Sequence, residues 1–598
     1  MKSILPALLL LLGTTLYSQI QQDTIVHRTV GPGVTYTRIV DSLVPWSIDV
    51  LRIELNNPYI KLETVKALDR LASGREKTSS MAARRNQPGH QVVGAINADF
   101  FEGTGLTVNT HVEKGEIIKR ENGWHTFGFT DDNKLSMNIP AFTGKFIAKN
   151  GLTLAIDSIN NTRQNGETVL YNKFFGSVTG TDNTGTEVLI RPLNKWWMND
   201  TVLCIVDSVG VNKGNHATGI YTVISGHGPA SQFLAQNTQK GDTVKMLLNL
   251  LPGLKRLTGM VGGRPAVVVN GAVANLNTGD PFVTARHPRT GVGFNQDSTV
   301  LYLFTVDGRQ AHSKGMNLFE FADLMLLHGV YTGINLDGGG STAMVVRNSV
   351  MNSPSDPTGE REVANALLVI SSAPVGTLHH IEIYPRMAKV FAGSQATFSV
   401  TATDEYYNPV PVPPGSVQYS LSKPALGTVN QQGVYTAGAV ADTGWLYVSI
   451  GQIKDSARIF AKALNFIRVE PKFTVTDVSR IVNFKGRAFD TDSVEQVIPQ
   501  QNYIWKSTDT TVGRIDAVGQ FQGVSSGETK VIAQYQNFRD TSLVRVELGS
   551  GVRTLDTLEN LSGWSVTGEN YDSIYTAIVL SDSNATAGSK SLQLDYRF

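Results

Sequence analysis

Cysteine is almost absent from this sequence. Its 598 residues include one, Cys204, so an intramolecular disulfide is excluded. Cys204 lies in an apolar run from Val202 to Val206, which favours a buried thiol on a strand over a nucleophile. We therefore look for the chemistry of this chain in its carboxylates, guanidinium groups and hydroxyls.

Charge is also scarce and nearly balanced. Charged residues make up 17% of the chain, and the formal net charge is +1 at pH 7. A protein of this kind has no electrostatic basis for binding nucleic acid or a membrane surface. We expect no nucleic acid among its partners.

Long hydrophobic runs are confined to the N-terminus. Lys2, the apolar stretch from Ile4 to Leu12 and a small residue at Ser18 predict a signal peptide over 1–18, with the mature chain beginning near Gln19. A buried N-terminal helix is the alternative. No other stretch approaches the ~18 apolar residues of a membrane span, so we expect a secreted or cell-envelope protein without a transmembrane segment.

The length of the chain predicts several domains, because a domain usually holds roughly 100–200 residues. Within 19–372, an amphipathic helix is expected over 318–328, with Asn317 as N-cap, Glu320 three residues later and Gly329 at its end. Apolar strands are expected on either side, over 300–306 and 333–336. This order predicts an α+β domain, a mixed sheet with packed helices.

The C-terminal part of the chain changes character after residue 372. Alternating strand patterns replace helical periodicity, and 419–436 parallels 503–522 at an offset of about 85 residues. We predict all-β modules over 377–462 and 464–548 that resemble bacterial immunoglobulin-like sandwiches. Residues 552–598 resemble the first strands of a galactose-binding-type jelly roll, an incomplete domain, since two or three strands seldom fold alone.

The segment with the clearest active-site composition follows the strand expected over 333–336. It combines an acid, three glycines and two hydroxyls: Asn335, Asp337, Gly338, Gly339, Gly340, Ser341 and Thr342. Glycines allow a ligand to approach the backbone closely, so the loop suits an anion or a group of sugar hydroxyls. A tight glycine turn between two core strands is the alternative.

Three further polar clusters follow apolar strands of the same domain. Asn97 and Asp99 are spaced to project from one face of a strand, although a strand end with turn chemistry has the same composition. His287 and Arg289 flank Pro288 in a cluster that suits bidentate binding of phosphate or carboxylate. Asp307 and Arg309 end the strand expected over 300–306.

These clusters, in this order, resemble the phosphodiester glycosidase family over about 90–372. The matching motifs are Gly94 to Phe101, His287 to Gly293, Val306 to Arg309, Asn335 to Thr342 and Arg361 to Leu367. The resemblance implies a secreted or lumenal hydrolase that removes a sugar linked through its anomeric oxygen to a phosphodiester. Asp99 departs from the family pattern, where a small or different polar residue is common. His227, in a Gly-His-Gly loop, resembles a family loop and is also typical of a structural turn.

Such a substrate needs cations for its phosphate and carboxylates for its sugar. We expect Arg289 and Arg309 to clamp the phosphate, with backbone donors from Gly338 to Ser341. Asp337 and Asp307 are expected to divide the roles of nucleophile or base and general acid. Orientation of substrate or loops is assigned to Asn97, Thr342 and Arg361, although for Arg361 a surface ion pair that includes Glu362 is the alternative.

The sequence requires no cofactor. Several Asp and Asn oxygens suit a hard divalent cation such as calcium, but no EF-hand loop or His/Cys zinc pattern occurs in the sequence. The expected partner is a phosphodiester-linked glycan or cell-surface polysaccharide. Two alternatives stay open: a non-catalytic glycan-binding or adhesive envelope protein, and a phosphodiesterase that acts on phosphate-linked polysaccharide.

Overall fold

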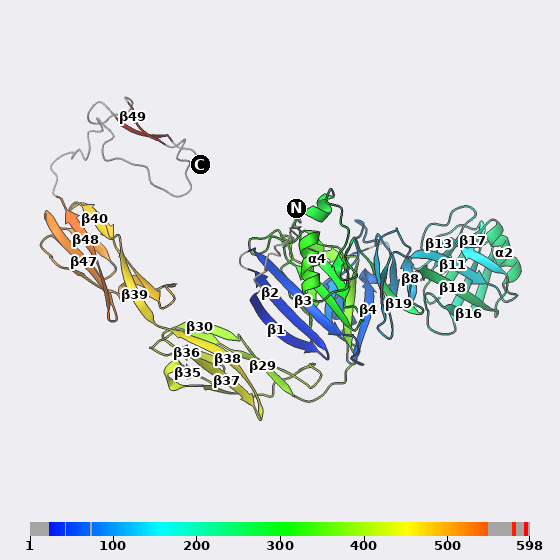
Figure 1. The fold of residues 1–598 in the computed structure, drawn as a ribbon, viewed down its shortest axis with the longest axis horizontal. Coiled ribbons are helices and arrows are strands. Elements are labelled where there is room, and N and C mark those ends of the chain that lie inside the picture. Colours follow the sequence, from blue (N-terminus) through cyan, green and yellow to red (C-terminus); the bar gives the residue numbers. More distant parts are fainter. Residues whose placement is uncertain (1–22, 42–43, 72–73, 548–576, 582–590, 596–598) are drawn as a thin grey trace, which may run out of the picture. The chain divides into compact units, whose positions relative to one another are not determined.

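The computed structural model describes residues 23–41, 44–71, 74–547, 577–581 and 591–595 (Figure 1). Contacts divide the chain into two compact units, one of residues up to 380 with 402–411, and one of 381–401 with the residues after 411. The described residues form 50 strands and four α-helices. The predicted signal peptide over 1–18 lies outside them.

The first unit is built on an eight-stranded sheet in which every neighbouring pair runs antiparallel. Its order is β1 (Asp23–Gly31), β2 (Val34–Asp41), β3 (Trp46–Glu54), β23 (Val300–Val306), β22 (Arg289–Phe294), β24 (Thr332–Asn335), β20 (Ala266–Val269) and β21 (Ala272–Val273). The mixed sheet that we expected is therefore wrong for this sheet. Two predicted strands, 300–306 and 333–336, are β23 and, one residue earlier, β24. Both pair with β22.

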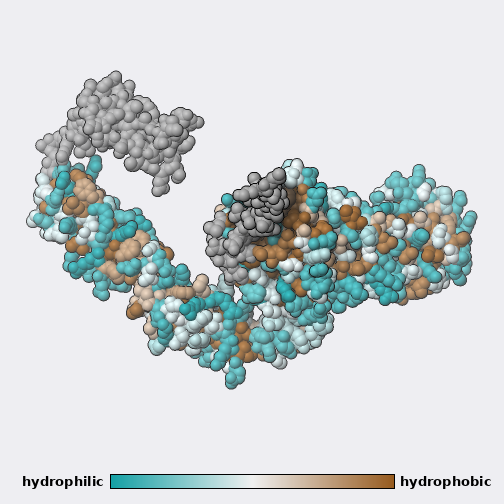
Figure 2. All heavy atoms as spheres, viewed as in Figure 1, coloured by the Kyte–Doolittle hydropathy of each residue, from teal (hydrophilic) through white to brown (hydrophobic). Residues whose placement is uncertain are grey.

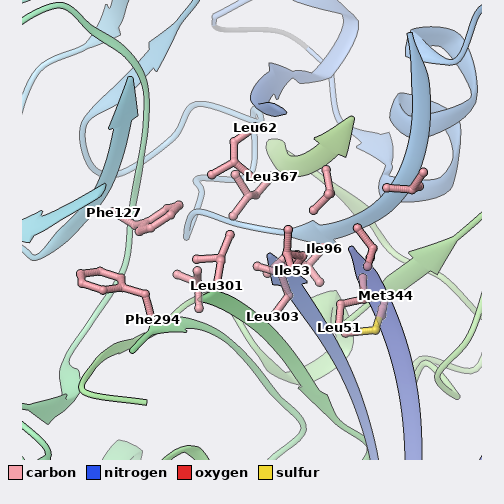
Figure 3. Close-up of a cluster of buried hydrophobic side chains, with 14 of the residues drawn as sticks. Leu51, Ile53, Leu62, Ile96, Phe127, Phe294, Leu301, Leu303, Met344 and Leu367 are labelled. Carbon is pink, nitrogen blue, oxygen red and sulfur yellow. The ribbon is translucent and has the colours of Figure 1, made fainter. Parts of the chain in front are cut away.

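Two five-stranded sheets share a core with this sheet. One is β26 (Ser349–Val350), β25 (Met344–Val346), β6 (Gln91–Asn97), β28 (Asn365–Ser371) and β4 (Ile60–Lys66). The other is β10 (Leu135–Asn138), β9 (Thr126–Thr130), β19 (Leu257–Gly262), β7 (His111–Glu113) and β8 (Glu116–Lys119). Side chains from all three meet in one apolar cluster, among them Leu51, Leu303, Ile96, Leu367 and Phe127 (Figure 3). This burial fixes the strand ends from which the site is built.

Helix α4 (Leu318–Leu327) occupies the sequence between β23 and β24. The Asn317 side chain accepts from the Glu320 N–H, and the Glu320 carboxylate accepts from the Asn317 N–H, which completes the predicted capping box. Phe321 packs edge-on against Phe304 of β23, with 6.3 Å between ring centroids. The helix therefore packs against the central sheet as expected, but helices are few in a mostly β protein.

The remaining helices are short. They are α1 (Thr78–Arg85), α2 (Pro229–Asn237) and α3 (Pro281–Thr284).

A second eight-stranded sheet has the order β12 (Thr153–Ile156), β11 (Ala141–Ile147), β18 (Thr243–Leu251), β16 (Thr201–Val211), β15 (Gly185–Pro192), β17 (Thr222–His227), β14 (Thr168–Tyr171) and β13 (Ser158–Ile159). Cys204 is buried on β16, and burial raises the pKa of its thiol to about 12. A structural thiol, as predicted, fits this position.

The second unit contains a repeated arrangement of sheets. The first copy pairs β30 (Met387–Phe391), β38 (Ile453–Lys462), β37 (Asp442–Ile450) and β34 (Gln418–Leu421), and the second pairs β40 (Phe473–Thr476), β48 (Phe538–Val546), β47 (Gly527–Tyr535) and β44 (Ile504–Ser507). In each copy the first two strands run parallel. The immunoglobulin-like assignment of these modules stays a prediction.

Of the predicted jelly-roll segment, the structure describes only β49 (Ala577–Ser581) and β50 (Ser591–Asp595), which pair antiparallel. The rest of 552–598 lies outside the described residues.

Hydrophilic residues predominate on the face of the chain seen in Figure 2, with smaller hydrophobic patches between them. In the part of the chain that the structure describes, no helix has the length and apolar character needed to cross a membrane.

Candidate active site

The loop after β24 is joined to the end of β6. The Asp337 N–H donates to the Ala98 carbonyl at 2.9 Å, and Asn97 Nδ2 donates to the Asp337 carbonyl at 2.7 Å. The Asn97 and Asp337 motifs, 240 residues apart, therefore meet at one place in the fold. The antiparallel core that holds β6 and β24 brings them together.

Asn97 itself is fully engaged within the protein. Its Oδ1 accepts from Thr290 Oγ1 at 2.9 Å and from the Ala343 N–H at 3.1 Å, and the side chain is completely buried. It connects β6, β22 and the loop after β24. This geometry fits the loop-orienting role that we expected and leaves its amide occupied by protein groups.

Asp337 is more accessible than Asp99 and Asp307, both of which are buried. It is partly exposed, yet surrounding protein raises its pKa to about 7. Ser341, the positive charge of Arg361 and the Gly338 N–H oppose this effect. A carboxyl group with a pKa near neutrality can change its protonation state during a reaction.

Asp99 is a second carboxylate with a raised pKa, and it is coupled to the first. It is buried, and desolvation raises its pKa to about 7, with a further increase from the charge of Asp337. Asn365 fixes it: the Asp99 N–H donates to Asn365 Oδ1 at 2.8 Å, and Asn365 Nδ2 donates to Asp99 Oδ2 at 3.0 Å. Because the two carboxylates repel each other, the pair binds its first proton more tightly than its second.

Asp307 belongs to a different network. Its Oδ1 accepts from Asn352 Nδ2 at 3.2 Å and from the Ser353 N–H at 2.9 Å, and Arg38 lies 3.8 Å from Oδ2. Asn352 Nδ2 also donates to the Thr342 carbonyl at 3.0 Å. Asp307 therefore supports the glycine loop through Asn352, and its carboxylate is surrounded by protein donors.

Arg289 is almost wholly buried, with 1% of its surface exposed. Its Nε donates to the Met316 carbonyl at 2.8 Å, and its Nη2 donates to the carbonyls of Phe282 and Ala285, both at 2.9 Å. Burial lowers the pKa of this guanidinium to about 10. These contacts hold α3 and the residue after it in place and occupy the donors of Arg289, which weakens the expectation that Arg289 binds a phosphate.

Arg309 has the surroundings expected of a residue that binds an anion. It is exposed, and its Nη2 lies 3.2 Å from His287 Nδ1. Burial, followed by the charges of Arg289 and Arg309, lowers the pKa of His287, so the ring is neutral at pH 7. Arg309 then donates to Nδ1, and the ring proton lies on Nε2, where it is a second donor.

The glycine loop holds this guanidinium against its backbone. Gly339 has a φ of +62°, and a Cβ there would lie 3.2 Å from Arg309 Nη2. A Cβ on Gly340 would lie 2.2 Å from Arg361 Nη2. Arg361 forms a bidentate pair with Asp356, at 2.6 and 2.8 Å, rather than with Glu362. Glycine at these positions thus admits two cations to the loop.

Two of the expected backbone donors of the loop, Gly339 and Ser341, are bonded to protein carbonyls. The Gly339 N–H donates to the Pro288 carbonyl at 2.9 Å, and the N–H groups of Ser341 and Thr342 donate to carbonyls of the loop at 3.2 Å. They form the 3-10 turn Gly339–Ser341. Buried oxygens of the loop, among them Asn335 Oδ1 and Thr342 Oγ1, have no hydrogen-bond partner among the described residues, a pattern typical of a site that binds water or ligand.

His227 is placed elsewhere. It ends β17 in the second eight-stranded sheet, where its Nδ1 accepts from the Gly166 N–H at 3.0 Å. It lines a pocket of about 290 Å³ with Arg163 and Asp182. The structure does not bring it to Asp337.

For a metal ion, the described residues provide no group of three or more His, Cys, Asp or Glu side chains arranged to hold one. The calcium expectation stays a prediction. Asn335 Nδ2 donates to the carbonyls of Arg264 and Leu336, at 2.7 and 2.8 Å, which secures the strand end next to Asp337.

Comparison with known proteins identifies the domain that contains most of these residues. Residues 206–370 match the sequence model of a family described as phosphodiester glycosidase. This segment is a phosphodiester glycosidase family domain. It contains the Arg289, Asp307 and Asp337 motifs, whereas Asn97, at the end of β6, and Asp99, two residues later, lie before the matched segment.

Relatives of the phosphodiester glycosidase domain match over short stretches. The chain is 36% identical over 87 residues to the SPbeta prophage-derived uncharacterized protein YomE of Bacillus subtilis (strain 168), which covers 14% of this chain and 13% of that protein. It is 40% identical over 75 residues to human N-acetylglucosamine-1-phosphodiester alpha-N-acetylglucosaminidase, 12% of this chain and 14% of that protein. A crystal structure of a hypothetical protein from Synechocystis aligns with a TM-score of 0.43 and 17% identity, over 57% of this chain and 62% of that one.

The residues that sequence reasoning missed are those that act through tertiary contacts. Asn365 fixes Asp99, and Asn352 links Asp307 to the glycine loop. Asn365 falls inside the Arg361 to Leu367 motif, so the phosphodiester glycosidase resemblance held a signal for it. Nothing local in the sequence distinguishes Asn352.

Proposed function

We propose that this protein hydrolyses a glycosyl phosphodiester at the anomeric carbon and releases a free sugar and a phosphomonoester. The coupled pair of carboxylates, Asp99 and Asp337, is the observation that carries this proposal. Both have a pKa raised to about 7, and Arg309, an exposed cation, lies on the glycine loop that follows Asp337. The phosphodiester glycosidase domain supports the reaction class.

In this proposal the two carboxyl groups share one proton, which gives them different roles. Asp99 is the more deeply buried member and keeps the proton, while the partly exposed Asp337 is ionised and faces the substrate. As the bond between the anomeric carbon and the phosphate oxygen breaks, its electron pair leaves with the phosphate. Asp337 stabilises the positive charge that develops on the sugar, either as nucleophile or as the base that takes a proton from the attacking water.

Arg309 and His287 bind the departing phosphate. The guanidinium supplies charge and a planar set of donors, and the neutral imidazole supplies Nε2–H. The phosphomonoester leaves as its dianion, which is a weak base because its protonation has a pKa of about 6, so the reaction needs little proton donation to it. In this proposal Asp307 takes a supporting role in place of the catalytic role expected from the sequence, because its Oδ1 accepts hydrogen bonds from Asn352 and Ser353 and its Oδ2 faces Arg38.

The experiment is release of N-acetylglucosamine from a synthetic N-acetylglucosamine-1-phospho-6-mannoside by the full chain. We expect turnover by the wild type and a loss of at least about a hundredfold in Asp337→Asn, the size of a lost acid-base group. Asp297→Asn, in an exposed turn, is the matched control and should keep full activity. A folded wild type without activity towards any glycosyl phosphodiester would favour a glycan-binding role and refute the proposal.

A further inference from the structure

Three aromatic rings form a partly exposed cluster beside the carboxylate pair, which we call the aromatic wall. Phe100 contacts Trp124 and Phe282 edge-on, with ring centroids 5.8 and 6.0 Å apart. All three side chains are partly exposed. Phe100 directly follows Asp99, so the wall borders the site at its buried carboxylate.

Arg264 lies across this wall. Its guanidinium carbon is 4.6 Å from the centre of the Trp124 ring and 5.1 Å from that of Phe282. Its backbone is locked to the strand that carries the site, since its N–H donates to the Asn335 carbonyl at 2.9 Å and its carbonyl accepts from Asn335 Nδ2. The cation is thus held in place by stacking and by the strand that leads to Asp337.

The guanidinium of Arg264 keeps its donors available. Its Nε is buried without a hydrogen-bond partner, and among the described residues no carboxylate forms an ion pair with it. Arg289 contacts the same Phe282 ring, at 5.1 Å, but spends its donors on three carbonyls. A buried, unpartnered donor on a partly exposed arginine is costly unless a ligand completes it.

We propose that Trp124, Phe282 and Arg264 form the subsite that binds the sugar ring of the substrate. This rests on the proposed function. The C–H face of a pyranose packs against an aromatic ring, and its hydroxyl or acetamido oxygens accept hydrogen bonds from a guanidinium, a combination that aromatic and arginine side chains together provide. The wall follows Asp99 in the chain, whereas Arg309 lies against Gly339 in the loop after Asp337, so in this proposal different side chains bind the sugar and the phosphate.

The test measures kinetics and sugar binding with the full chain. In Trp124→Ala we expect KM for the synthetic diester to rise about tenfold, with kcat changed by less than about threefold, as for lost binding that ground and transition states share. Trp124→Phe should stay within about threefold of the wild type because it keeps a stacking face. Arg264→Gln, on a partly exposed side chain, covers the case that Trp124→Ala fails to fold.

The matched control is Trp445→Ala. Trp445 also stacks with an arginine, Arg458, at 4.8 Å, but lies in the repeat modules, and its removal should leave KM unchanged. If Trp124→Ala, Trp124→Phe and Trp445→Ala have the same KM as the wild type while the diester is hydrolysed, the subsite is refuted and the proposed function stands.

Binding of free N-acetylglucosamine and of glucose, followed by tryptophan fluorescence, separates the two proposals. We expect a sugar-dependent change that is lost in Trp124→Phe, whatever the outcome of the hydrolysis assay. Such a change in a protein that hydrolyses no diester would support the subsite while the reaction fails. A Trp124-dependent response to inorganic phosphate, with none to either sugar, would overturn the subsite.

Discussion

Substitution of Asp99 by Asn should change the pH dependence of stability. Burial raises the pKa of Asp99 from its ordinary value of 3.8 to about 7. The native carboxyl therefore keeps its proton to a higher pH than the carboxyl of the unfolded chain. Between these two values the native state binds more protons, so its stability falls as pH rises. Well below pH 3.8 both states are protonated and the effect is absent.

The magnitude follows from the size of the shift. Each pH unit in this window costs about 1.4 kcal/mol, so Asp99 alone removes about 2–3 kcal/mol between pH 5 and pH 8. Asp99→Asn has no such loss. Any cost of replacing the buried carboxyl by an amide is the same at both pH values and cancels when the two are compared. The variant should therefore gain about 2–3 kcal/mol relative to the wild type between pH 5 and pH 8.

The assay is unfolding of the full chain in urea at both pH values, with hydrogen exchange of β6 amides reporting on the unit that contains Asp99. Asp297→Asn, an exposed carboxylate, should follow the wild type. Equal pH dependence in the wild type and Asp99→Asn would show that Asp99 is ionised in the folded protein at pH 5, and the shared-proton pair would be refuted.

Three further predictions concern the loop and its supports. Gly339→Ala should lower kcat/KM about tenfold, since it combines a strained φ with displacement of Arg309. The control is Gly359→Ala: Gly359 has a φ of +83° and no atom close to the position of a Cβ, so this variant should lose stability but keep its kcat/KM. Steady-state kinetics and melting curves distinguish the two outcomes. Arg309→Gln should raise KM for the diester about tenfold and abolish competitive inhibition by phosphate, and unchanged inhibition would exclude it as a phosphate ligand. Asn97→Ala should destabilise the protein by about 2–4 kcal/mol in urea unfolding, because three hydrogen bonds are lost in a buried place; a loss under about 0.5 kcal/mol would mean that water replaces the amide.

The sequence predicted elements whose signals are local. The α4 capping box depends on two residues three positions apart, Asn317 and Glu320. The strand over 300–306 is an almost unbroken run of apolar residues. The glycine loop was recognisable because its composition needs no partner to be informative. The antiparallel order of the central sheet depends on which strands meet, and a pattern of single strands does not contain that information.

The roles of charged residues were harder to predict for the same reason. Arg289 has the composition of a phosphate ligand, but carbonyls of Phe282, Ala285 and Met316 surround it. Asp307 is bonded to Asn352, 45 residues away. Asp99 gains its raised pKa from burial, and the charge that adds to it belongs to Asp337, in the loop after β24. Only the fold shows which carboxylates influence each other.

Hydrolysis in water labelled with oxygen-18 tests the central claim most directly. The full chain is incubated with N-acetylglucosamine-1-phospho-6-mannoside, and both products are analysed by mass spectrometry. Attack at the anomeric carbon, assisted by Asp337, predicts that the label enters the released sugar and that the phosphomonoester stays unlabelled. Label in the phosphate would mean attack at phosphorus, and would contradict the role of the carboxylate pair.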